Sequence, residues 1–427
     1  MGASSNGSSK TVGHAIVTDV SHRRHVGLGT GSGVSRSGIR HLLCAVLTTL
    51  GPPAFAAPAR VDDAKHAPEP AWYDRIKIRG YTQVRYNRLG ATNPDLKNEQ
   101  ADKSIGAPGG FLIRRARVIL YGDMSRHVSI YLQPDFAAGS VGDVVHLVQL
   151  RDWYSDIHLD RRREFRFRVG QSKVPYGFEN MQSSQNRLPL DRHDALNSTV
   201  KDERDLGVFF YWAPESVRKK LKELVDSGLK GSGDYGMTAI GFYNGQTANQ
   251  RERNDNKHFV ARVAYPFDVG GQTLELAAGG YTGRYVPSVG EGIRAAKEHR
   301  DFRLHGTFVL YPKPFGVQAE YTAGYGPERV GDRVEERPLE GGYVMAMWRQ
   351  KLGDHVLVPY VRVHRYDGGK KWIENAPRHV VRELNAGLEW QATKWLELTT
   401  ELMASERTVD GETEAGRLVR FQLQVNY

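Results

Sequence analysis

Apolar and polar side chains alternate with a period of two over most of this chain, and the alternation continues to its last residue. In the first run, 76–88, apolar or small residues occupy most even positions, and polar or aromatic residues occupy the odd ones. A period of two is that of a β-strand with one apolar face. The sequence therefore predicts an all-β fold of about 16 strands of roughly 10 residues each. The further runs lie near 111–124, 127–136, 145–159, 164–171, 204–213, 235–245, 257–266, 273–285, 301–311, 315–325, 341–350, 355–366, 380–391, 395–406 and 416–427.

The lengths of the predicted strands and of their connections favour a membrane barrel. Tilted strands of about 10 residues are long enough to cross a bilayer. The connections are alternately long and short: 89–110 is long, whereas 125–126 and 312–314 are tight. Outer-membrane barrels show this alternation, because their short turns face the periplasm and their long loops face outside. We predict a transmembrane antiparallel β-barrel over 76–427, with short periplasmic turns and long extracellular loops.

Two connections have special features. The third loop, 172–203, is too long for a simple hairpin, and folding into the lumen is one way to satisfy its polar groups. It is therefore the candidate constriction of the barrel. The segment 214–234 should be a periplasmic turn, yet Val217, Leu221 and Leu224 have helical spacing. We expect a short amphipathic helix there, docked at the periplasmic mouth.

The N-terminal segment has the pattern of an export signal. Basic residues within 36–41 precede the apolar run 42–50, and Ala54-Phe55-Ala56 offers a cleavage site. We expect 1–56 to be a signal peptide with an over-long N-terminal extension, and 57–75 to be a periplasmic segment. The single cysteine, Cys44, lies inside this signal, so disulfides play no part in the exported chain.

The C-terminal strand also points to the outer membrane of a Gram-negative bacterium. Its apolar residues alternate up to the terminal aromatic Tyr427, which resembles the signal that the barrel assembly machinery recognises. Outer-membrane lipid and lipopolysaccharide are the expected surroundings.

Other classes of protein find little support. No stretch of about 20 uninterrupted apolar residues occurs, which excludes a bundle of membrane helices. Neither G-x-S-x-G nor H-E-x-x-H is present, so nothing indicates an enzyme, a metal site or a cofactor. The cluster 191–194 could be a metal or catalytic site, but a hydrated loop is the simpler interpretation. No nucleic-acid partner is expected, because the basic residues alternate with lipid-type residues instead of clustering on a helix.

The alternation also predicts which side chains line the pore. An Arg or Lys on the lipid face costs about 2–4 kcal/mol at the bilayer midplane, so the basic strand residues should face the lumen. Guanidinium groups bind two oxygens of an oxyanion at once, and conduction requires several weak sites. Glutamates such as Glu383 and Glu401 also face inward on the later strands, so a basic arc opposes a partly acidic one. The predicted pore-lining residues of the strands are Lys77, Arg79, Arg85, Arg115, Arg117, Tyr121, Arg166, Arg168, Arg262 and Arg362.

Five motifs follow one another along the chain: FLIRRAR at 111–117, VGQSKVPYGFE at 169–179, ERDLGV at 203–208, FYNG at 242–245 and VPYVR at 358–362. Together they resemble one known family, the phosphate-selective porins O and P. The resemblance extends over the chain after about Ala71. It implies a 16-stranded barrel, usually a homotrimer, that passes phosphate, polyphosphate or related small anions. In this family a lysine cluster at the constriction is fed by an arginine ladder on the wall.

The resemblance also implies roles for particular residues. Lys173 lies within the matching loop motif, and Arg115 and Arg117 occupy the matching double-arginine strand, so these three are expected to contact the anion. In the third loop the further candidates are Arg187, Arg192 and Lys201. The matching C-terminal region has few lysines. A general or weakly selective porin therefore stays open as an alternative, as does a non-conducting structural or adhesin barrel.

Overall fold

The computed structural model describes residues 71–90, 110–141, 144–199 and 204–427. The predicted signal peptide, most of the predicted periplasmic segment and the candidate Lys201 lie outside the described residues. The described chain starts with the short 3-10 helix η1 (Trp72–Arg75), which leads directly into the first strand.

The strands are numbered along the chain. They are β1 (Ile76–Gly90), β2 (Gly110–Asp123), β3 (Val128–Val141), β4 (Val144–His158), β5 (Phe165–Lys173), β6 (Arg204–Trp212), β7 (Thr238–Tyr243), β8 (His258–Val269), β9 (Gln272–Tyr285), β10 (His299–Leu310), β11 (Phe315–Val330), β12 (Arg333–Trp348), β13 (Gln350–Leu352), β14 (His355–Gly369), β15 (Arg378–Gln391), β16 (Leu396–Val409) and β17 (Glu412–Asn426).

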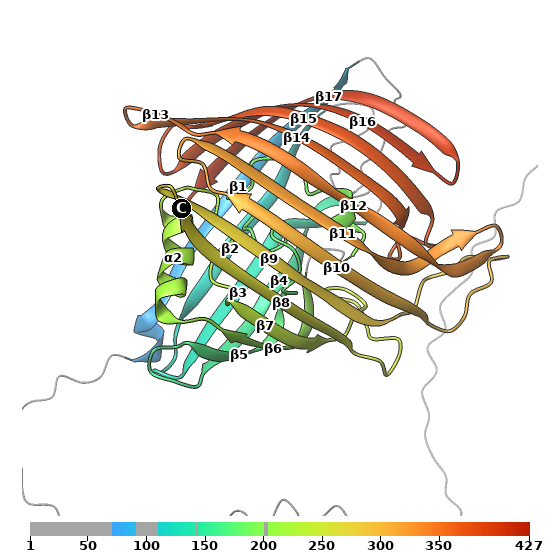
Figure 1. Ribbon diagram of the computed structural model, residues 1–427, viewed down its shortest axis with the longest axis horizontal. Coiled ribbons are helices and arrows are strands. Elements are labelled where there is room, and N and C mark those ends of the chain that lie inside the picture. The colour runs from blue at the N-terminus through green and yellow to red at the C-terminus, as the bar shows by residue number, and fades with distance from the viewer. Residues whose placement is uncertain (1–70, 91–109, 142–143, 200–203) are drawn as a thin grey trace, which may run out of the picture. The chain divides into compact units, whose positions relative to one another are not determined.

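These strands form one antiparallel sheet that follows the chain order and closes on itself (Figure 1). Closure comes from β1, which pairs with β2 on one side and with β17 on the other. The strands β12 and β13 both pair with β14 and are separated only by Arg349, so they count as one strand of the wall. The molecule is therefore a closed barrel of 16 strands, and the predicted fold class is confirmed.

Alternate residues of each strand face opposite sides of the barrel. On β14, for example, Val361 and Val363 are 48% and 57% exposed, whereas Tyr360, Arg362 and His364 are buried. The exposed apolar set recurs around the barrel and is the surface that a bilayer would cover. The buried set is mostly polar and charged and lies on the inner side, where it contacts the chain that fills the lumen.

Two hairpins extend further than the sequence pattern predicts. The gaps between the period-two runs predict connections over 326–340 and 407–415, but β11 and β12 remain paired up to a turn at Gly331 and Asp332, and β16 and β17 up to Asp410 and Gly411. Beyond the bilayer both faces of a strand can be polar. The period-two signal therefore disappears there, although the backbone pairing continues.

The connection between β5 and β6 lies inside the barrel. We call its described part, 174–199, the inner loop; it carries the one-turn helix α1 (Asp194–Asn197). Most of its residues are buried. Its apolar side chains Val174, Tyr176 and Leu196 pack against inward residues of β6 to β9, including Phe209 and Tyr281. The loop therefore crosses the lumen and contacts the wall on more than one side.

A second internal element is the helix α2 (Glu215–Asp226), which lies within the segment for which helical spacing was noted. Val217, Leu221 and Leu224 form its buried face. They pack against Phe178 of the inner loop and against the inward-facing Val309 of β10. The helix thus supports the inner loop from the short-turn end of the barrel. No helix among the described residues is both long and apolar enough to cross a membrane.

Candidate pore constriction

The family-like motif at the end of β5 shapes the start of the inner loop. Lys173 is buried, and its Nζ donates hydrogen bonds to the backbone oxygens of Met181 at 2.9 Å and Gln182 at 2.6 Å. Gly177 has a φ of +70°, and a Cβ there would lie 2.6 Å from a carboxylate oxygen of Glu320 on β11. That carboxylate also accepts the backbone N–H of Phe178. A glycine is therefore required where the loop turns against the wall.

Ion pairs with the barrel wall hold the part of the inner loop around Asp191. Asp191 contacts three arginines of the wall: Arg85 of β1 at 3.3 Å, Arg114 of β2 at 3.8 Å and Arg420 of β17. Burial alone would raise the pKa of Asp191, but the charges of Arg420 and Arg85 outweigh burial and hold this pKa well below its usual range. Asp191 is therefore ionised and joins the loop to both sides of the β1–β17 seam.

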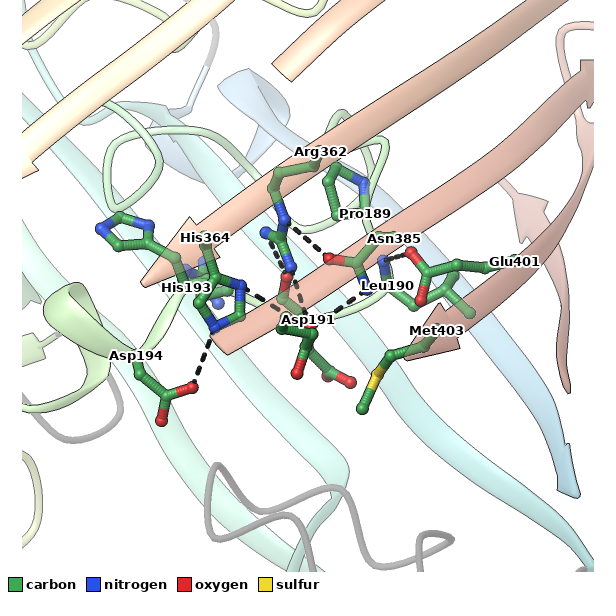
Figure 2. Close-up of polar contacts among 12 residues, drawn as sticks. Pro189, Leu190, Asp191, His193, Asp194, Arg362, His364, Asn385, Glu401 and Met403 are labelled. Carbon is green, nitrogen blue, oxygen red and sulfur yellow. Dashed lines mark hydrogen bonds and ion pairs between the residues drawn. The ribbon is translucent and has the colours of Figure 1, made fainter. Parts of the chain in front are cut away.

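Asp194 contacts cationic and histidine side chains from β14, from β16 and from the connection that follows β14. Its carboxylate lies 3.2 Å from Nε2 of His364 (Figure 2). It also lies 2.6 Å from Nζ of Lys370 and 3.3 Å from Nη2 of Arg407. Burial opposes ionisation here too, but Arg407 and Lys370 keep the pKa of Asp194 well below its ordinary value.

Between Asp191 and Asp194, His193 forms a carboxylate–histidine–carboxylate group with Glu179 of the inner loop and Glu320 of β11. His193 Nδ1 is 2.6 Å from Glu179, and its Nε2 is 3.5 Å from Glu320. Glu179 also accepts a hydrogen bond of 3.1 Å from Arg362 of β14. Arg362 in turn donates to the backbone oxygen of Asp191 at 2.9 Å (Figure 2). Despite burial, the pKa of Glu179 is lowered, because His193 and Arg362 stabilise its charge.

Most of the predicted pore-lining arginines are buried and paired with a carboxylate. Besides Arg85 and Arg362, described above, the shortest ion pairs are Arg117 to Asp135 at 2.7 Å, Arg166 to Asp234 at 2.8 Å, Arg168 to Asp156 at 2.8 Å and Arg262 to Glu275 at 3.3 Å. Arg168 also lies 3.7 Å from the ring centre of Tyr154. Burial and an inward direction therefore do not by themselves leave a guanidinium available to an anion.

Two of the predicted arginines differ from this group. Arg115 donates to Gln83 at 2.7 Å, and Arg187 donates to the backbone oxygens of Pro189 and Leu190 at 3.0 and 3.2 Å. Both side chains are buried, and their charges are close enough to repel each other. Neither forms an ion pair with a carboxylate within the described ranges, and Nε of Arg115 and Nη1 of Arg187 find no hydrogen-bond acceptor there. We call Arg115 and Arg187 the surplus pair.

The remaining candidates differ in their exposure. Lys77 is exposed at the short-turn end of β1. Arg79 is partly buried, with its guanidinium 5.5 Å from the ring centre of Tyr121. Arg192 is buried in the inner loop. The described part of the chain contains no group of three or more His, Cys, Asp or Glu side chains arranged to hold a metal.

The partners of the arginines are what the sequence reasoning missed. The cluster 191–194 supplies the acidic contacts of the inner loop, rather than forming a simple hydrated loop. Arg407 and Arg420, which bind these acids, were not selected as candidates. The available signal was the presence of inward arginines at alternate positions of the last two strands, opposite an acidic loop.

Comparison with known proteins identifies the family. A family model described as phosphate-selective porin O and P matches residues 87–427. The chain belongs to this family. It is thus an outer-membrane porin of the Gram-negative type. No curated protein matches the chain.

Solved structures show the same barrel fold at low sequence identity. The outer-membrane channel DcaP of Acinetobacter baumannii aligns with a TM-score of 0.52 and 13% identity, covering 82% of this porin and 97% of that chain. OmpF of Salmonella typhi, in a complex with daunomycin, gives 0.52 and 12%, with 82% and 97% covered. An anion-selective porin from Comamonas acidovorans gives 0.50 and 10%, with 82% and 99% covered.

Proposed function

We propose that this porin mediates passive uptake of phosphate, polyphosphate or related small anions through a lumen lined by the arginines named above. The observation that carries the proposal is the surplus pair. Arg115 on the wall and Arg187 on the inner loop are two buried cations without a carboxylate in the described chain. The other buried arginines of the wall described above are matched by acids, so the excess positive charge is concentrated at this point.

The physical argument concerns the cost of leaving cations uncompensated. A buried charge is unfavourable unless a partner offsets its lost hydration. A passing oxyanion can supply that partner, and two guanidinium forks can replace several of its water contacts with directed hydrogen bonds. The mutual repulsion of the two arginines is relieved while the anion is present and returns when it leaves. The site is therefore suited to transient occupation, which conduction requires.

In this proposal the other inward cations contribute the surrounding field. Arg79 on the wall and Arg192 in the inner loop attract anions, the paired Arg117, Arg166 and Arg168 contribute less because their acids offset them, and Lys173 adds charge while it fixes the start of the inner loop. Because Lys173 holds the backbone of the loop, its replacement would change shape and charge together. The surplus pair is therefore the cleaner place for a test.

The test is a reversal-potential measurement across a potassium chloride gradient in planar bilayers, repeated with phosphate added. The wild-type porin should give a potential of anion sign, and phosphate should reduce the chloride current. Arg115→Gln and Arg187→Gln should each shift the potential toward zero and weaken the phosphate block. Arg333→Gln, which removes the same charge from an exposed turn, is the control. A reversal potential of cation sign for the wild type would overturn the proposal.

A general or weakly selective porin is the second candidate function. It is favoured by the pairing of Arg85, Arg362 and Arg420 with acids of the inner loop and wall, because such pairs reduce the net positive field. It predicts a small anion preference and no block by phosphate. Absence of any single-channel conductance would instead indicate a structural or adhesin barrel.

We also propose that the porin is a homotrimer, which rests on the family alone. The expected result is a detergent-solubilised species of three times the monomer mass that dissociates only on heating. A monomer that is stable under the same conditions would contradict this proposal.

A further inference from the structure

The outer face of the barrel carries a row of charges at the edge of its apolar band that lies toward the long connections. On β15 the outward residues Trp390, Leu388, Ala386 and Leu384 are followed by Arg382. The same change occurs on neighbouring strands, at the side from which the long connections emerge. The charged residues that end the outward apolar run are Glu340 on β12, Arg365 on β14, Arg382 on β15, Glu406 on β16, Arg417 on β17 and Arg88 on β1.

The arginines of this row exceed the acids and are placed against one another. Arg365 and Arg382 occupy directly opposite positions of β14 and β15, where like charges destabilise a strand pair. Each of the two has one acidic neighbour: Arg365 lies 3.9 Å from Glu340, and Arg382 lies 3.5 Å from Glu406, so these two acids offset part of the repulsion. Arg417 and Arg88 are exposed and form no ion pair within the described residues. The row therefore has an excess of positive charge.

An apolar groove lies next to these charges. It has a volume of about 590 Å³ and runs over the outer surface of β14 to β17. Its outward apolar lining includes Val363, Leu384, Ala404 and Ala415, and Arg365, Arg382 and Arg417 stand along it. The small residues leave a hollow between larger neighbours, with cations at its edge. This combination of an apolar channel and a cationic rim matches a lipid that has acyl chains below a phosphorylated headgroup.

We infer that this groove is a binding site for a phosphorylated glycolipid of the outer leaflet, with its phosphate held by Arg365, Arg382 and Arg417 and an acyl chain in the groove. The side of the membrane follows from the long connections, which face outside in barrels of this type. Charge complementarity selects a lipid over a second copy of the chain, because the four arginines of the row exceed its two acids and therefore attract a phosphate, whereas another such row would repel them. The inference rests on the outer-membrane location and not on ion selectivity.

The test uses native mass spectrometry of the detergent-solubilised full-length porin with two probes, bisphosphorylated lipid A and its dephosphorylated form. The wild type should retain the bisphosphorylated form preferentially. The double variant Arg382→Gln/Arg417→Gln should bind it roughly tenfold more weakly and lose the preference. Arg333→Gln, an exposed arginine at the turn between β11 and β12, should leave binding unchanged.

A variant with the opposite expected effect separates loss of the site from misfolding. Glu406→Gln removes the carboxylate that competes for Arg382, and it should therefore strengthen binding of the bisphosphorylated lipid. Equal binding of the two probes, or equal effects of Arg333→Gln and the double variant, would overturn the inference. Loss of the oligomer in the double variant would overturn it in favour of a subunit interface. Reversal potentials should be unchanged in all these variants, so failure here is distinguishable from failure of the anion-uptake proposal.

Discussion

Two of the sets of buried arginines inside this barrel differ in their partners. Arg85, Arg362, Arg407 and Arg420 meet the acids of the inner loop, and we call them the latch arginines. Arg115 and Arg187, the surplus pair, meet no carboxylate in the described chain. All six are buried to a similar extent. The comparison teaches that neither burial nor direction distinguishes a residue that holds the fold from one that can bind a passing ion; the distribution of acids does.

The largest effect is expected from breaking the latch. Asp191→Asn would leave Arg85 and Arg420 buried beside a neutral side chain. Breaking a buried ion pair by removing one partner typically costs about 3–5 kcal/mol. We expect the folded barrel to unfold at a clearly lower temperature, measured by the change in electrophoretic mobility on heating. Lys219→Gln is the control, because its pair with Glu215 on α2 is exposed. An unchanged unfolding temperature in Asp191→Asn would mean that the latch does not hold the loop.

A smaller effect is expected from the surplus pair, and it should appear in selectivity and not in stability. Arg187→Gln removes one of two repelling charges, so the unfolding temperature should not fall. The anion-to-cation permeability ratio should decrease by roughly fivefold, which corresponds to about 1 kcal/mol of lost attraction. Arg187→Lys, which keeps the charge, should retain most of the ratio. If the Gln variant were as unstable as Asp191→Asn, the two sets of arginines would have the same role.

The smallest expected effect is that of moderate acid on the latch. The lowered pKa values of Glu179, Asp191 and Asp194 mean that their pairs contribute full stability above the ordinary carboxyl pKa of about 4. This contribution is lost only as the pH falls through the lowered values of the folded state. The stability that the latch contributes, measured as the difference in unfolding temperature between the wild type and Asp191→Asn, should therefore stay constant between pH 8 and about 5.

The measurement is a series of heating curves at different pH, with chloride current recorded in parallel. If the difference in unfolding temperature between the wild type and Asp191→Asn began to shrink near pH 6, the assignment of these carboxylates as the latch would be contradicted. A constant difference combined with unchanged chloride selectivity would sharpen the comparison, because the surplus pair has no carboxylate to titrate.

Much of the fold could be predicted from the sequence, because a barrel in a bilayer imposes a strict pattern. The apolar face of each strand must meet lipid. Because side chains alternate along a strand, Arg85, Arg115 and Arg362 must then point into the lumen. The extended hairpins could not be predicted, since 326–340 has polar residues on both faces and loses the pattern. The partners of the arginines could not be predicted either. Asp191 contacts residues of β1, β2 and β17 that are up to 229 positions away in the chain. Local patterns in the sequence do not predict contacts of such long range.

The seam between β1 and β17 has a consequence for assembly. Its paired residues, such as Tyr81 and Asn426, are separated by almost the whole described chain, and contacts of such long range form slowly. Until they form, both strands present open edges that can pair with other chains. The seam is also tight, because a Cβ at Gly80 would lie 2.4 Å from the backbone oxygen of Arg117 and from the ring of Tyr427. Changes at Gly80 should therefore lower the yield of inserted barrels and promote aggregation, while the channels that do close conduct normally.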